Sequence, residues 1–242
     1  MFDKWMQYSY AAQKRERYRL LRGILVLLAL YLLYNSITAF FVSVWVLRNE
    51  SMQPGLHTGD RLLVTSIALP SLFADLQKGK RNFPVKRGTV VLIDMRRAEK
   101  RKPYLIAADA LVRFFTAQRV SILGGEEYLF LKRIIGLPGD EISMTNFVLR
   151  VKPAGSSYTL TEFELSEKPY YPNIPEVRAL WDESLPFAGN MDRIVLGPDE
   201  CFAVSDDRSN TRDSRTWGPL SPDLITGKAA FRFWPLGGIG RP

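Results

Sequence analysis

The sequence predicts a mainly β protein that carries one transmembrane helix near its N-terminus. Two observations lead to this prediction. An uncharged apolar stretch covers residues 23–47, and the chain after it breaks into short β-rich runs separated by Gly, Pro and Asp. With 242 residues, the chain has room for one sizeable domain beside the anchor.

The apolar stretch lies between Arg22 and Arg48 and contains no Asp, Glu, Lys, Arg or His. Its length of about 25 residues exceeds the roughly 20 that a helix needs to cross a bilayer. A cleaved signal peptide would have a shorter apolar run of about 7–15 residues and a cleavage site of small residues, whereas this stretch ends in Trp45-Val46-Leu47. A buried core helix would show a polar face, which the stretch lacks. A permanent anchor is the favoured interpretation.

The charges that flank the anchor predict its orientation. By the positive-inside rule, residues 1–22 stay in the cytoplasm and residues 48–242 form an extracytoplasmic domain. The net charge of +8 could indicate nucleic acid or a membrane surface, and translocation of the domain favours the membrane. The basic residues ahead of the anchor, set against only two acidic ones, are Lys4, Lys14, Arg15, Arg17, Arg19 and Arg22.

After the anchor, the pattern predicts strands and few helices. Residues 107–118 form the best helix candidate. Two basic segments, 66–86 and 98–123, look like insertions, and residues 152–193 look like a loop-rich cap with short strands. The lone Cys201 excludes an internal disulfide and is expected to be a buried thiol. The predicted strands are 61–65, 89–93, 128–135, 147–151, 158–165, 201–204 and 229–234.

Ser51 is the first candidate for chemistry, because it follows the membrane exit almost directly. A serine in a loop with Pro54 and Gly55 is ordinary turn chemistry, and a hydroxyl needs a base to become a nucleophile. The only histidine, His57, has Asp60 nearby, but six residues along one loop give no assurance that a triad converges. We therefore expect His57 to have a surface or loop role.

Lys132 is the alternative base. It lies in an apolar strand, and alternation places it on the same face as Phe130 and Ile134. Burial disfavours the charged form of an amine, so its pKa should fall, and a neutral amine can accept the serine proton. From this strand alone, an edge lysine that guards against aggregation is an equally good interpretation.

The motifs around these two residues resemble those of bacterial signal peptidase I. The resemblance covers the chain from about Arg48 to the C-terminus, with the motifs in the family's order. Thr89, Ser205 and Asp207 stand where the family usually has Asp, Gly and Asn. The motifs are Ser51-Met52-Gln53-Pro54-x-Leu56 with Gly59-Asp60, then Arg87-Gly88-Thr89-Val90-Val91, then Lys132 to Asp140, then Ser205 to Arg215 with Trp217-Gly218, and finally Gly227 to Leu236.

The resemblance implies a signal-peptidase-like antiparallel fold and a role for each matching residue. Ser51 would be the nucleophile and Lys132 the general base of a Ser-Lys dyad that works through an acyl-enzyme. Thr211, at a position that is usually Ser, would bond the lysine amine, and Asp213 and Arg215 would form a salt bridge. The backbone N–H of Ser51 would be one oxyanion donor and the Asn49 side-chain amide the second.

The resemblance also implies the substrate and the location. Signal peptides of exported preproteins, with small residues at positions −1 and −3, would be cut at the extracytoplasmic side of the bacterial cytoplasmic membrane. Membrane phospholipid and the secretion translocon are candidate partners, and no nucleic acid, metal or organic cofactor is expected. Two alternatives stay open: a self-cleaving Ser-Lys protease, against which the anchor argues, and a catalytically silent paralogue that acts as a membrane-anchored binding or scaffold protein.

Overall fold

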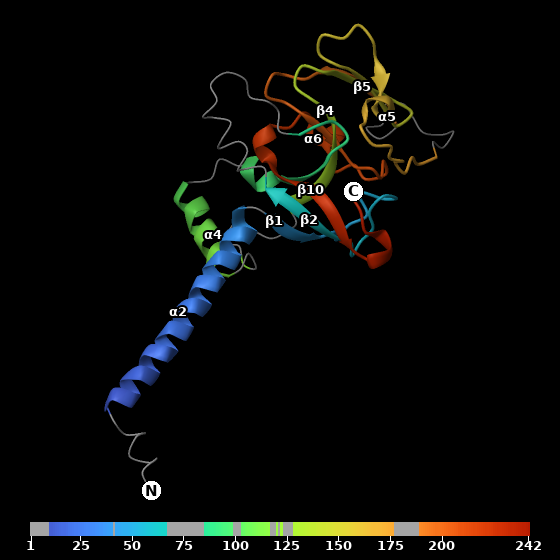
Figure 1. Cartoon of the computed structure of the whole chain (residues 1–242). Coiled ribbons are helices and arrows are strands. Elements are labelled where there is room, and N and C mark those ends of the chain that lie inside the picture. The colour runs from blue at the N-terminus through green and yellow to red at the C-terminus, as the bar shows by residue number, and fades with distance from the viewer. Residues whose placement is uncertain are drawn as a thin grey trace.

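The computed structural model describes residues 10–40, 42–66, 85–98, 103–116, 120, 122, 128–176 and 189–242. A long helix, α2, projects from a body made of two antiparallel sheets (Figure 1). The helices are α2 (Tyr10–Phe40), η1 (Met95–Ala98), α4 (Pro103–Phe115), α5 (Glu162–Leu165), α6 (Ser214–Trp217), η3 (Pro222–Leu224) and η4 (Leu236–Gly238).

The larger sheet has six strands in the order β1-β2-β10-β3-β4-β9, and all its neighbours are antiparallel. The smaller sheet has the order β7-β6-β5-β8. The predicted mainly β, antiparallel fold with one apolar N-terminal helix is therefore confirmed. The strands are β1 (Val42–Val46), β2 (Arg61–Ser66), β3 (Val90–Asp94), β4 (Leu129–Gly136), β5 (Glu141–Thr145), β6 (Val148–Lys152), β7 (Leu160–Thr161), β8 (Met191–Val195), β9 (Phe202–Val204) and β10 (Ile225–Trp234).

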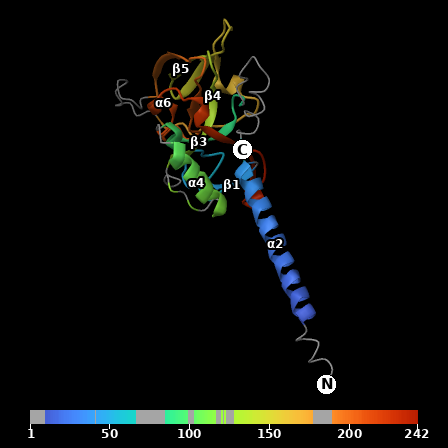
Figure 2. The same cartoon turned by 90° about the vertical axis from the view of Figure 1, so that its left-hand side faces the viewer.

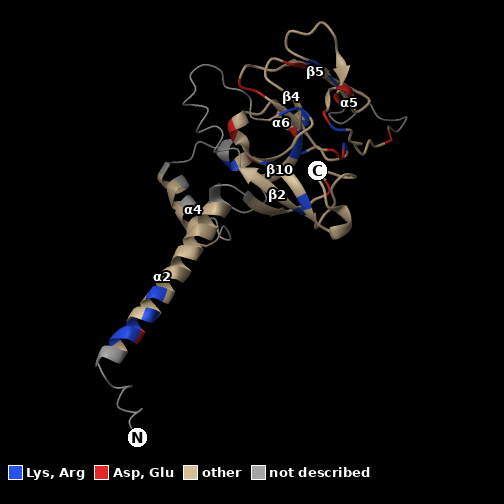
Figure 3. Ribbon diagram, viewed as in Figure 1, with Lys and Arg blue, Asp and Glu red and all other residues tan. Residues whose placement is uncertain are grey.

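Helix α2 contains the only stretch in the described part of the chain that is long and apolar enough to cross a membrane, Gln13–Ile37. Its N-terminal half carries the basic residues, which form the blue bands on α2 in Figure 3. The predicted span of residues 23–47 is wrong at its C-terminal end, because the helix stops at Phe40. Val42–Val46 alternates β-branched and other residues and pairs with β2 instead, from Val42 opposite Thr65 to Val46 opposite Arg61.

Three apolar clusters hold the body together. One lies around β1, β2 and the loop between them and includes Leu47, Met52 and Leu62. A second packs β3, β4 and β9 against the C-terminal segments through Val91, Ile134 and their neighbours. A third joins the two sheets. Each buried aliphatic side chain of this kind contributes roughly 1.5–3 kcal/mol relative to exposure.

The cap differs from its prediction. Residues 158–165 were expected to form a strand, but only Leu160–Thr161 do. The Thr161 hydroxyl and the Glu164 carboxylate form a capping box that starts helix α5 at Glu162. Strands β5 and β8 were not predicted, and together with β6 and β7 they form the smaller sheet, of which β5 and most of β6 precede the predicted cap of residues 152–193. The predicted helix at 107–118 is observed as α4, a few residues earlier, while most of the predicted insertion 66–86 lies outside the described residues.

Candidate active site

Ser51 lies in the loop between β1 and β2, and its side chain is fully buried. Met52 and Leu56 on either side pack into the first apolar cluster. The ends of the loop are tied by backbone hydrogen bonds, of 2.9 Å from Leu47 N to Asp60 O and of 2.8 Å from Gly59 N to Leu47 O. Gly59 has a φ of +94°, which glycine adopts without strain. The loop therefore holds Ser51 in a defined position.

The hydrogen bonds of Ser51 run to Asn49 and to the loop of residues 205–215. The Ser51 hydroxyl donates to Asn49 Oδ1 at 2.8 Å, and the Ser51 N–H reaches the same oxygen at 3.2 Å. The carbonyl of Ser51 accepts from the backbone N–H of Asp207 at 3.1 Å. Asn49 thus presents its oxygen, an acceptor, to Ser51, and its role as an oxyanion donor stays a prediction.

Lys132 lies on β4 with a side chain that is 1% exposed. Its Nζ donates a hydrogen bond of 2.7 Å to the Ser205 hydroxyl and lies 5.9 Å from the centre of the Phe130 ring. The contact with Phe130 agrees with the strand alternation predicted from the sequence. Ser205 follows β9, which pairs with β4. The partnership of Ser205 with Lys132 was missed from the sequence, where the only signal was a hydroxyl in place of the family's usual glycine.

The surroundings of Lys132 lower the pKa of its amine from 10.5 to about 8. Burial is the largest cause, because it strips water from the charged form. The carboxylates of Asp213 and Asp206 oppose this by favouring the charged amine, and the guanidinium groups of Arg215 and Arg212 add to the lowering. A useful fraction of this amine is therefore neutral near neutral pH, as a general base requires.

Asp213 and Arg215 form the salt bridge that the resemblance implied, with Arg215 Nη2 2.7 Å from Asp213 Oδ2. The same carboxylate accepts the backbone N–H of Ser205 at 2.9 Å, so it fixes the residue that holds Lys132. Burial alone would raise the pKa of Asp213, but hydrogen bonds and charge from Arg215, with help from Ser205 and Lys132, lower it. The carboxylate is therefore ionised and acts as a fixed anchor for the loop.

The remaining predicted residues lie at or near this loop. The Thr211 carbonyl accepts hydrogen bonds from Thr216 Oγ1 at 2.5 Å and from Asp213 N at 2.9 Å. The hydroxyl that accepts from Lys132 Nζ belongs to Ser205. His57 is exposed and donates its backbone N–H to Asp60 at 3.0 Å, in line with its predicted loop role. Among the described residues no hydrogen bond joins Ser51 Oγ to Lys132 Nζ, and each is turned to its own partner.

Two buried ion pairs brace the walls of the site. Arg133 Nη2 lies 2.6 Å from Asp206 Oδ2, and its guanidinium stacks 4.1 Å from the centre of the Tyr170 ring. Arg208 and Glu162 are paired at 2.5 Å with no exposure of either side chain, which joins the loop to helix α5. In the part of the chain that the structure describes, no group of three or more His, Cys, Asp or Glu side chains could hold a metal ion.

Comparisons with known proteins show the family to which the chain belongs. The profile of the family described as signal peptidase, peptidase S26, matches residues 19–234. Signal peptidase IB of Staphylococcus aureus (strain N315) is 25% identical, over 90% of this chain and 91% of that protein. Signal peptidase I of Leptolyngbya laminosa is also 25% identical, over 95% of this chain and 87% of that protein. Because the family profile spans nearly the whole chain, the protein belongs to the signal peptidase family, peptidase S26.

Proposed function

We propose that this protein is a membrane-anchored endopeptidase that removes signal peptides from exported preproteins, with Ser51 as nucleophile and Lys132 as general base. The observation that carries the proposal is the buried amine of Lys132, whose pKa is lowered to about 8 and which donates a hydrogen bond to the Ser205 hydroxyl. An exposed lysine near neutral pH is almost wholly charged and cannot take a proton. Burial lowers the pKa of the amine, so that part of it is neutral near neutral pH, as a lysine base requires.

The proposed reaction has two halves. Ser51 Oγ attacks the carbonyl carbon of the scissile bond, and its proton passes to the neutral Lys132 amine. The carbon–nitrogen bond then breaks, the leaving amine takes that proton, and an ester to Ser51 remains. In the second half, Lys132 accepts a proton from water while the water oxygen attacks the ester. The ester carbon–oxygen bond then breaks, Lys132 returns the proton to Ser51 Oγ, and the free acid is released.

Two rearrangements are needed before the first step. The Ser51 hydroxyl must turn from Asn49 towards Lys132, and the Ser51 N–H must exchange Asn49 Oδ1 for the substrate carbonyl oxygen. The latter bond is 3.2 Å long, near the weak end for an N–H donor, so it is easily exchanged. We assign the second oxyanion donor to Asn49, whose amide would face the substrate once its oxygen is displaced. Ser205 holds the amine meanwhile, with Asp213 and Arg215 supporting it and Thr211 as an alternative hydroxyl.

The anchor supports the choice of substrate. Helix α2 leads into β1 within two residues, and Ser51 follows five residues after β1 ends, so the nucleophile lies close to the membrane. Signal peptides end at that level. The basic N-terminal half of α2 favours a cytoplasmic N-terminus and an extracytoplasmic body, and the bacterial cytoplasmic membrane is the proposed location. Small residues at positions −1 and −3 are the proposed specificity, with phospholipid and the translocon as partners.

One observation favours a second candidate, a catalytically silent paralogue that binds preproteins without cutting them. Ser51 and Lys132 are hydrogen-bonded to different partners rather than to each other. In a silent paralogue this arrangement would persist when substrate is bound. In the peptidase it is the resting state only.

Cleavage of a radiolabelled preprotein by the detergent-solubilised full chain separates the two candidates. The peptidase requires a product cut at the signal-peptide boundary, and loss of that product in both Ser51→Ala and Lys132→Ala. His57→Ala is the matched control, since this exposed loop residue should leave cleavage intact. Binding of the preprotein without cleavage by the unaltered chain would establish the silent paralogue.

A further inference from the structure

Helix α4 exposes an apolar face that the proposed reaction does not use. Tyr104, Leu111 and Phe115 are 63%, 59% and 61% exposed, and Val120 and Ile122 just beyond the helix are also exposed. Scattered apolar side chains are normal on a surface, but a contiguous group of large ones marks a contact with a partner or a membrane. The face therefore needs an occupant.

The position of α4 identifies that occupant. The Tyr31 hydroxyl of α2 donates a hydrogen bond to the Phe115 carbonyl, and the two helices are in contact. Tyr31 lies within Gln13–Ile37, the stretch able to cross a membrane, nine residues before α2 ends at Phe40. Counted from Ile37, where that stretch ends, six residues at 1.5 Å each place the C-terminal end of α4 about 9 Å along the anchor, within a hydrocarbon half-thickness of about 15 Å. Figures 1 and 2 both show α4 at the level of the last turns of α2.

The polar groups of α4 are matched to an apolar surrounding. The buried carboxylate of Asp109 pairs with Arg113 at 3.1 Å and accepts the backbone N–H of Ile122 at 2.6 Å. At the C-terminal end, Thr116 Oγ1 donates to Val112 O at 2.7 Å and accepts from Val120 N at 3.2 Å. Hydrocarbon penalises unpaired charges and unsatisfied backbone groups, so such pairing is what an inserted helix needs.

The sequence ahead of α4 is strongly basic. Lysine and arginine near a membrane surface are attracted to anionic headgroups, by about 1 kcal/mol each. The basic residues of this segment, apart from the buried Arg96 that pairs with Asp94, are Arg97, Lys100, Arg101 and Lys102.

We propose that α4 is a second membrane-contacting element, inserted beside α2 with Tyr104, Leu111 and Phe115 against lipid acyl chains. This inference rests on the proposed membrane anchoring by α2 and adds a second attachment on the catalytic side. Two attachments fix the rotation of the body about the anchor, which one helix alone leaves open. The occupant of the apolar face is phospholipid.

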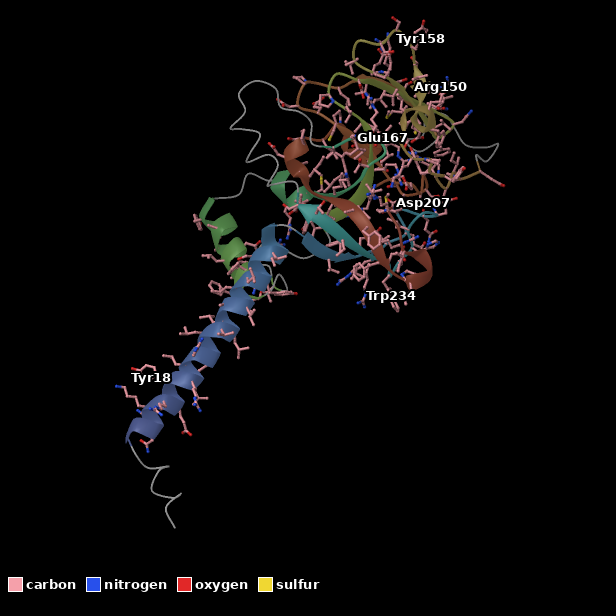
Figure 4. The ribbon with its side chains drawn as sticks, in the orientation of Figure 1. Tyr18, Arg150, Tyr158, Glu167, Asp207 and Trp234 are labelled. Atoms are coloured by element: carbon pink, nitrogen blue, oxygen red, sulfur yellow. The ribbon has the colours of Figure 1, made fainter. Side chains whose placement is uncertain are left out.

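The test uses nitroxide spin labels on the full chain in phospholipid nanodiscs. The single native cysteine, Cys201, is buried and burial raises the pKa of its thiol to about 12, so a cysteine introduced elsewhere is labelled selectively. The test variants are Leu111→Cys and Phe115→Cys. Leu27→Cys, on the lipid-exposed side of α2, and Tyr158→Cys, at the end of the body remote from α2 (Figure 4), are the controls. Collision rates with oxygen, which enriches in lipid, and with a water-soluble nickel complex are measured for each label.

The proposal requires that both α4 labels match Leu27→Cys, with high oxygen and low nickel accessibility, while Tyr158→Cys shows the reverse. Nickel accessibility at positions 111 and 115 equal to that at position 158 would overturn it. Exclusion of both reagents would also overturn it, in favour of a protein partner or a second copy. A nickel-accessible label at position 27 would instead refute the anchoring by α2, which separates the two failures.

Discussion

Arg212 offers a direct test of how the site controls Lys132. The Arg212 side chain is exposed, and its guanidinium carbon lies 4.8 Å from the centre of the Phe130 ring, on which Lys132 Nζ also lies at 5.9 Å. The charge of Arg212 contributes to the lowered pKa of Lys132. Replacing Arg212 with Gln should therefore raise the pKa of the amine and move the rise of kcat/KM to higher pH.

The expected size of the pKa shift of Lys132 follows from the distances of both cations to the Phe130 ring. Since both groups touch Phe130, the two cations are separated by no more than about 11 Å, which corresponds to a repulsion of about 0.4 kcal/mol in water and about 1.5 kcal/mol at an effective dielectric constant near 20. At 1.36 kcal/mol per pH unit, Arg212→Gln should raise the midpoint by about 0.3 to 1 pH unit. The sign is fixed, because the neutral amine is the active form and loss of a neighbouring cation favours the charged one.

The assay is the pH profile of kcat/KM on a signal-peptide substrate, from about pH 6 to pH 10, which reports the groups of the unliganded enzyme. The unaltered protein should show a midpoint at about 8. The profiles should be compared at about 0.01 M and about 1 M salt, where the screening length falls from about 30 Å to about 3 Å. The difference between Arg212→Gln and the unaltered protein should be present at low salt and largely lost at high salt.

Two control variants make the result specific. Arg212→Lys keeps the positive charge and should keep the midpoint. This variant separates the effect of the charge from the effect of the guanidinium packing on the Phe130 ring. Arg150→Gln removes an exposed charge on strand β6 of the smaller sheet and should also leave the midpoint unchanged. A midpoint that Arg212→Gln does not move at low salt, or one near 10 in the unaltered protein, would refute the account of a buried lysine tuned by its neighbours.

Three further predictions follow from buried groups. Lys132→Met should abolish cleavage yet raise the free energy of unfolding by up to about 3 kcal/mol at pH 7, because the folded state no longer holds a desolvated amine. Thermal or denaturant unfolding in detergent measures this difference. The free energy of unfolding of the unaltered protein should rise as pH increases from about 8 to 10.5, because in this range only the unfolded chain keeps the proton on Lys132. Ser205→Ala should lower kcat about 5- to 10-fold with little change in KM, and Ser205→Thr should restore it, whereas Thr211→Val should have a smaller effect; steady-state kinetics decides between the two hydroxyls. Arg208→Met should destabilise the fold by about 3–5 kcal/mol because it leaves the charge of Glu162 buried without its cation. The double variant with Glu162→Met should recover part of this loss in the same unfolding experiment, because it also removes the acceptor for the Tyr170 hydroxyl and the Leu149 N–H.

The sequence was most informative where one physical signal dominates. The charge-free run after Arg22 predicts α2, and the apolar strand around Lys132 predicts β4 with its amine inside. The end of α2 was missed because Val42–Val46 is apolar enough for lipid and also suited to a strand. Only its pairing with β2 decides between the two.

The finer details of the site depend on backbone paths that no local pattern encodes. Ser205 reaches Lys132 because β9 lies beside β4 and Asp213 draws the loop back onto it. The sequence shows a serine in an unusual position but not which amine it meets. The orientation of Asn49 towards Ser51 is likewise set by the turn between them. The strands β5 and β8 escaped prediction because polar residues interrupt their apolar ones, as expected of a sheet with one face exposed.

The short connection between α2 and β1 limits the distance between Ser51 and the end of the anchor. Strand β1 pairs with β2 along its whole length, so Val42–Val46 belongs to the larger sheet and does not act as a free linker. Eleven residues lead from Phe40 to Ser51, and at about 3.4 Å per residue they reach about 37 Å at most, which limits how far Ser51 can lie from the end of the anchor. For the proposed peptidase, this limit means that the height of a scissile bond above the lipid contributes to its selection beside its side chains, so an otherwise suitable sequence far from the membrane would not reach Ser51.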